Sequence, residues 1–139
     1  MRFPLEITDQ FILEPFLHAF GVTSESSYVE LGDGVLEVGM GSWFHETIPL
    51  EEIAQIAPSD WPWWGGLGVK LIPHGVGVIG SLDNVVNVQL KGLREMRVLA
   101  TVKASQLAIS IADRDGFLAA LSAATHLPVA PHVAFSVRH

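Results

Sequence analysis

The sequence contains no cysteine and few basic residues, and each shortage removes a class of function. Without cysteine the chain has no disulfide, no thiol nucleophile and no thiolate metal ligand. Only 8 of its 139 residues are Lys or Arg, against 15 Asp or Glu, and the formal net charge is -7. An acidic average surface repels phosphate backbones and anionic lipid headgroups. We therefore expect no nucleic-acid partner.

Long apolar runs are missing as well. The most continuous ones, residues 76–82 and 117–124, are far shorter than the roughly 18 residues of a membrane-spanning helix, which predicts that no segment spans a membrane. Glu6 and Asp9 interrupt the start of the chain, so it does not resemble a signal peptide. We expect a cytoplasmic protein.

Apolar residues are plentiful, although their runs are short. They make up 49% of the sequence beside 17% charged residues, which is a high fraction for a small monomer. A chain of 139 residues is long enough for one domain and too short for two ordinary ones. We therefore expect a single domain over residues 1–139, with an extensive core or a face that is buried in a homo-oligomer.

Short apolar stretches separated by Gly, Pro, Asp and Asn indicate an antiparallel β fold. The clearest signal is a hairpin, in which residues 28–31 and 35–38 flank the turn Gly32-Asp33-Gly34. Further strands are expected at residues 43–48, 53–57, 68–72, 75–80, 85–90, 94–101 and 107–111. Within residues 85–90, apolar Val86, Val88 and Leu90 alternate with Asn87 and Gln89, which predicts one dry and one wet face.

Two segments have helical spacing. Asp113 is a good N-cap for a helix over residues 114–124, which ends before Leu127-Pro128. Residues 9–20 also have helical spacing, with Pro15 either kinking the helix or starting a shorter one. After the helix over residues 114–124, residues 128–139 form either a loose tail or one more strand.

Two segments carry a family resemblance. Ile48-Pro49-Leu50-Glu51-Glu52-Ile53 resembles the exit of a third strand into a turn, and residues 107–111 followed by 113–121 resemble a last strand and its helix. Together with the hairpin, they make the chain similar to bacterial pleckstrin-homology-like (PH-like) domains over residues 27–124. The second segment also resembles actinobacterial proteins that have no assigned activity.

The resemblance implies a mainly β (β+α) fold. It would be a small antiparallel half-barrel or sandwich of about seven strands, closed by a C-terminal helix, with a short N-terminal helix at residues 9–20 added to it. It also implies binding or scaffolding, and it supplies no catalytic residue. Relatives that bind inositol phosphates have basic residues in the first hairpin, where this chain has Gly32-Asp33-Gly34. Phosphoinositide binding is therefore not expected.

Two glycine patterns imitate nucleotide-binding motifs. Gly75, Gly77 and Gly80 have the spacing of the dinucleotide fingerprint, but residues 81–84 read as a turn and a strand follows, where the fingerprint requires a helix. The cluster at residues 65–68 lacks the Lys-Ser/Thr pair of a phosphate-binding loop. We expect no cofactor, and we expect Gly75, Gly77 and Gly80 to lie in a strand and its turns.

No pattern selects a catalytic or metal site. The six histidines lack ligand spacing, and the adjacent His45 and Glu46 would point to opposite faces of a strand. Possible nucleophiles, bases and orienting acids are Ser42, Ser110, His45, His74, Asp60 and Asp113, but no spacing among them indicates a triad. We assign no catalytic and no metal-binding residue.

The most unusual segment is residues 60–66, which contains three of the four tryptophans between a proline and two glycines. Trp61, Trp63 and Trp64 either cover the open side of the barrel or anchor a partner subunit, an apolar ligand or a membrane interface. We name them as candidate binding residues. The chain is accordingly expected to be a non-enzymatic interaction or scaffolding module, acting on itself or on another protein; the alternative is a small apolar-ligand binding protein or an enzyme with a Trp-lined pocket.

Replacing Trp63 and Trp64 together with alanine separates these interpretations. We expect the segment to lie beside the last strand and helix or at a subunit contact, because burying a large apolar side chain stabilises a protein by roughly 1.5–3 kcal/mol. Lost stability would indicate core packing. Thermal melting and native mass spectrometry measure the outcome. Unchanged stability with fewer subunits would instead indicate an interface, and no change in either would indicate an external partner.

Overall fold

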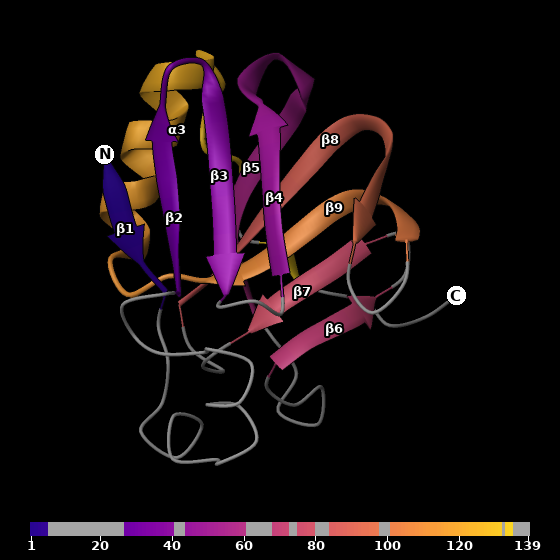
Figure 1. The fold of residues 1–139 in the computed structure, drawn as a ribbon. Coiled ribbons are helices and arrows are strands. Elements are labelled where there is room, and N and C mark those ends of the chain that lie inside the picture. Colours follow the sequence, from indigo (N-terminus) through magenta and orange to yellow (C-terminus); the bar gives the residue numbers. More distant parts are fainter. Residues whose placement is uncertain are drawn as a thin grey trace.

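The structure is a computed structural model that describes residues 1–5, 27–40, 44–60, 68–72, 75–79, 84–97, 101–131 and 133–134. The strands form a four-stranded and a six-stranded sheet. Figure 1 shows the first sheet in front of the second, with a helix beside them. The described part of the chain is therefore mainly β with one C-terminal helix, as the sequence predicts. The expected N-terminal helix at residues 9–20 lies outside the described residues.

The four-stranded sheet is antiparallel throughout. In spatial order it contains β1 (Arg2–Pro4), β2 (Ser27–Gly32), β3 (Val35–Met40) and β4 (Phe44–Pro49). The predicted hairpin is confirmed as β2 and β3, which are joined by a two-residue turn. Asp33 and Gly34 both have positive φ, of 54° and 76°, which matches the right-handed twist of the two strands.

The six-stranded sheet holds the rest of the strands. They are β5 (Ile53–Asp60), β6 (Gly68–Ile72), β7 (Gly75–Ile79), β8 (Val85–Arg97), β9 (Thr101–Ser110) and β10 (Val133–Ala134), in the spatial order β10-β5-β8-β9-β7-β6. A short 3-10 helix, η1 (Leu50–Glu52), connects β4 to β5 and so joins the two sheets in sequence.

The helix predicted near the C-terminus is confirmed as α3 (Arg114–Thr125). The Asp113 side chain caps it by accepting a hydrogen bond from the Gly116 backbone N–H at 3.1 Å. Phe117, Leu118 and Leu121 face the core, and the Phe117 ring meets the Phe3 ring of β1 edge to face, with centroids 5.3 Å apart. Because α3 also packs against β5 and β8, it links the β1 edge of one sheet to the other sheet.

One cluster of buried apolar residues joins both sheets and α3. The four-stranded sheet contributes inward residues at every second position, such as Val29 and Leu31 of β2 and Leu36 and Val38 of β3. The residues between them point to the outer face of that sheet, which carries the site described below. No helix among the described residues is long and apolar enough to cross a membrane.

The sheets differ from the prediction in number and direction of strands. About seven strands were expected, all antiparallel, whereas the described residues form one sheet of four and one of six. Two pairs, β7 with β9 and β10 with β5, are parallel. The first arises because β8 does not pair with β7: β9 returns antiparallel to β8 and lies between them.

The prediction for residues 85–101 is wrong in two respects. The two strands expected at 85–90 and 94–101 are one strand, β8, with a register shift between Gln89 and Arg94, and Thr101 begins β9. The face expected to be wet is buried at Asn87, which is 1% exposed. Asn87 lies in register with Ala57 and Ala108, both fully buried, and its side-chain amide donates to the Gln106 side chain at 3.1 Å.

Candidate functional site

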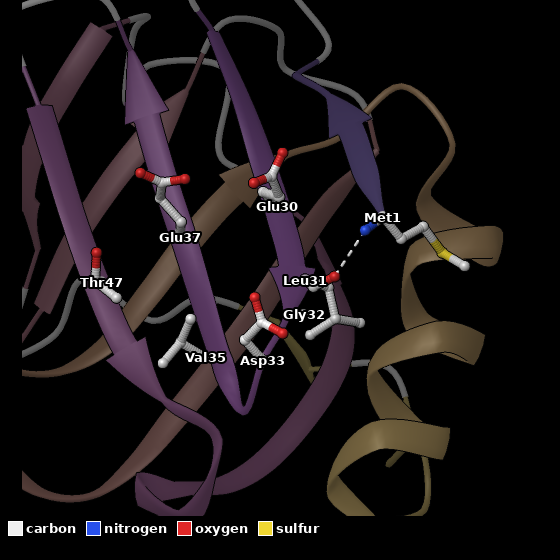
Figure 2. A pocket seen from close by; sticks show the side chains of 8 residues that line it. All are labelled: Met1, Glu30, Leu31, Gly32, Asp33, Val35, Glu37 and Thr47. Carbon is white, nitrogen blue, oxygen red and sulfur yellow. Dashed lines mark hydrogen bonds between the residues drawn. The ribbon is translucent and has the colours of Figure 1, made fainter.

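A hollow of about 450 Å³ lies on the outer face of the four-stranded sheet, over the β2–β3 hairpin. Its lining residues are Met1, Glu30, Leu31, Gly32, Asp33, Val35, Glu37 and Thr47. Figure 2 shows Glu30, Glu37 and Thr47 on three neighbouring strands, with Asp33 and Val35 nearer the turn. The hollow therefore combines three carboxylates with an apolar residue at the hairpin end, whereas the exposed Met1 side chain points away from them toward α3 (Figure 2).

Strand register gathers these carboxylates. Glu30 is directly opposite Glu37, and Glu37 is directly opposite Thr47, so the three residues form one row across β2, β3 and β4. Like charges directly opposite each other in a sheet are destabilising. The row therefore needs partners nearby, and Arg2 and His45 provide them.

Arg2 neutralises one end of the row. Its Nε donates to Glu30 Oε1 at 2.9 Å, and its guanidinium carbon lies 4.1 Å from the centre of the Tyr28 ring. The ring in turn lies over Gly39, where an added Cβ would be 3.2 Å from the Tyr28 Cε1 atom. Glycine at this position lets the ring lie against the sheet beneath the guanidinium.

His45 lies beside Glu37, in the middle of the row, with its Nε2 2.5 Å from Glu37 Oε2. Burial raises the pKa of the Tyr28 hydroxyl, the Glu37 and Glu30 charges and a hydrogen bond to Glu37 raise it further, and Arg2 opposes this shift. A raised pKa keeps the phenol protonated, so Tyr28 donates to Glu37 and is a poor nucleophile or base.

Asp33 is the carboxylate without a cation of its own. Within the described part of the chain no ion pair reaches it, and it is exposed at the hairpin turn. Glu30 and Glu37 each use one oxygen for their ion pair, and a carboxylate has acceptor sites on both oxygens. The hollow can therefore hold an additional cationic group on an apolar stem.

The structure does not bring the possible catalytic residues together. Ser110 is fully buried in β9, Asp113 caps α3, and Asp60 ends β5, whereas His45 is exposed on the outer face of the other sheet. The side chains of His45 and Glu46 point to opposite faces, as expected: Glu46 Oε2 accepts from the Arg97 N–H at 3.1 Å. Ser42 and His74 lie outside the described residues.

Of the other predicted features, some lie within the described residues and others lie outside them. Gly75 and Gly77 lie in β7, as expected for strand glycines, and Gly80 lies outside the described residues. Trp61, Trp63 and Trp64, the candidate binding residues, also lie outside them. Across the described ranges, no group of three or more His, Asp or Glu side chains is arranged to hold a metal ion.

Sequence reasoning missed the hollow, although a signal for it was present. The turn at Asp33-Gly34 fixes the register of the hairpin, and this register alone places Glu30 opposite Glu37. His45 belongs to the next strand, on the same face and diagonal to Glu37.

No known protein family, curated protein or solved structure matches the chain.

Proposed function

We propose that this chain is a non-enzymatic interaction module that binds a basic segment of a protein in the hollow over the β2–β3 hairpin. The observation that carries the proposal is the convergence of Glu30, Asp33 and Glu37 around one hollow that also has apolar lining. An arginine or lysine side chain has the matching chemistry, because it carries a cationic head on an apolar stem.

The arrangement favours binding over catalysis. Tyr28 stays protonated, and His45 is held by Glu37 with no Ser or Cys among the residues that line the hollow. The hairpin that holds basic residues in phosphoinositide-binding relatives holds Asp33 here, and its carboxylate repels phosphate. These features support a cationic ligand over an anionic one.

We propose in addition that the fold is a variant of the PH-like half-barrel. What supports this is the order of elements, with a hairpin of β2 and β3 first and α3 directly after the long strand β9. The packing of α3 between the β1 edge and β5 is consistent with a helix that closes the open side of a barrel. The six-stranded sheet with its two parallel pairs would then be an elaboration of that plan.

Neutralising the hollow should abolish most of the binding to a basic peptide. In Asp33→Asn with Glu37→Gln, we expect the dissociation constant of an amidated tetra-arginine peptide to rise roughly ten-fold, because two exposed charge contacts of about 0.5–1 kcal/mol each are lost. NMR titration of labelled protein at low salt measures it. With the unaltered chain, the backbone amides of Glu30, Asp33, Glu37 and Thr47 should shift on binding.

The matched control is Glu95→Gln with Asp115→Asn, which removes the same two charges from exposed positions outside the hollow. It should change the dissociation constant by less than about two-fold, because neither side chain lines the hollow. Equal losses for both double variants would mean that only net charge matters, and the hollow would then have no role. Asparagine suits the positive φ at residue 33, so the turn is retained.

A further inference from the structure

A second charged surface lies on the strands β8 and β9, which carry four of the eight basic residues of the chain: Lys91, Arg94, Arg97 and Lys103. Glu95 is the only acidic residue in either strand. In a chain of formal net charge -7, these two strands are therefore strongly positive. We call the segment formed by residues 91–97 and 101–103 the basic arm.

The basic arm is exposed. At the register shift of β8, residues 91–93 are all exposed, and Arg97 and Lys103 are exposed on the paired part of the hairpin. Arg94 is occupied within the chain, because its guanidinium donates to the Thr47 carbonyl at 2.7 Å and pairs with Glu52 at 3.4 Å. Among the described residues no ion pair engages Lys91, Arg97 or Lys103, although Glu95 lies opposite Lys103 in the strand pairing.

The acidic hollow and the basic arm each also have an apolar side chain. Within the described ranges, the large hydrophobic side chains that remain exposed are Met1, Leu93 and Val129. Leu93, 62% exposed, is on the basic arm, and the half-buried Val35 lines the acidic hollow, whereas the Met1 side chain points away from the hollow (Figure 2). Each surface thus has an apolar side chain beside charges, and the two signs are opposite.

We infer that the basic segment bound by the hollow is the basic arm of a second copy of the chain. Lys91 and Arg97 of one copy would meet the carboxylates of the other. This inference rests on the proposed function and names its partner. The contact joins two different surfaces. Two copies can therefore form a closed dimer, in which each hollow binds the basic arm of the other copy, or successive copies can form a ring.

Charge reversal tests the inference directly. The hollow-reversed variant is Glu30→Lys with Glu37→Lys, and the arm-reversed variant is Lys91→Glu with Arg97→Glu. At low salt and about 100 µM protein, where interactions of micromolar affinity are largely formed, sedimentation velocity should find the unaltered chain assembled and each variant monomeric. An equimolar mixture of the two variants should assemble again, because each offers the surface that the other lacks.

Two results would overturn the inference: a monomeric unaltered chain at this concentration, or reversed variants that assemble as the unaltered chain does. If a reversed variant melts early, the neutral pairs Glu30→Gln with Glu37→Gln and Lys91→Gln with Arg97→Gln serve instead, and each should raise the dissociation constant for self-association at least about ten-fold. Failure of self-association leaves the proposed function standing if tetra-arginine still binds. Failure of peptide binding as well would remove both.

Discussion

Replacing Gly75 with alanine should destabilise the protein by about 3 kcal/mol or more, the upper end of the cost of overpacking. A Cβ at this position would lie 2.5 Å from the Gln106 carbonyl oxygen and 2.5 Å from its Cγ. Gly75 and Gln106 are partners in the parallel pairing of β7 with β9, and the next pair, Val76 and Leu107, is fully buried. The backbone therefore has no room to yield. Urea denaturation followed by tryptophan fluorescence measures the loss.

Gly32→Ala is the matched control. Gly32 ends β2 on the surface, and a Cβ there would have no atom within 4 Å. Its substitution should change the free energy of unfolding by less than about 0.5–1 kcal/mol. A Gly75→Ala variant as stable as Gly32→Ala would contradict the close approach of β7 to β9.

Replacing Phe117 with alanine should cost about 3–5 kcal/mol, as is usual for a fully buried phenylalanine. The side chain is 0% exposed and contacts the Phe3 ring edge to face. Because α3 and β1 meet through this pair, hydrogen exchange should become faster in both elements together. Thermal denaturation and amide hydrogen exchange of the same sample test both expectations.

Phe117→Leu is the control for this site, because it keeps most of the apolar volume and should cost less than about 1.5–2 kcal/mol. A loss below about 1 kcal/mol for Phe117→Ala would show that α3 does not hold the two sheets together. Accelerated exchange in α3 with none in β1 would show that the ring pair does not couple them.

The hairpin and the last helix are predictable from sequence because their causes are local. Asp33 and Gly34 set the turn between β2 and β3, and Asp113 caps α3 through a residue three positions away. Gly116 lies in the first turn of α3, where glycine costs about 1 kcal/mol relative to alanine. The structure adds a reason for it: a Cβ there would lie 2.2 Å from the Asp113 Oδ2 atom, so glycine leaves room for the cap.

The features that sequence reasoning missed depend on contacts that are distant in the chain. Whether Asn87 is exposed to solvent depends on what packs against its face of β8. The alternation of apolar and polar residues within β8 does not predict what packs there. Gly92 suggests a break between two strands, but β8 continues past it, because residues 94–97 still pair with residues 101–104 of β9. The hollow could be predicted only in part. Its Glu30–Glu37 pair follows from the hairpin turn, whereas Met1 lines it only because β1 pairs with β2.

The position of β9 between β8 and β7 also sets an order for synthesis on the ribosome. β7 can pair with β6 as soon as residues 68–79 have emerged, but its other edge has no partner until residues 101–110 are made. Val76, Val78 and Ile79, all fully buried in the finished protein, are exposed to other chains during that interval. The nascent chain therefore passes through a stage at which a chaperone that covers apolar strand edges would raise its yield, and this stage ends when β9 inserts.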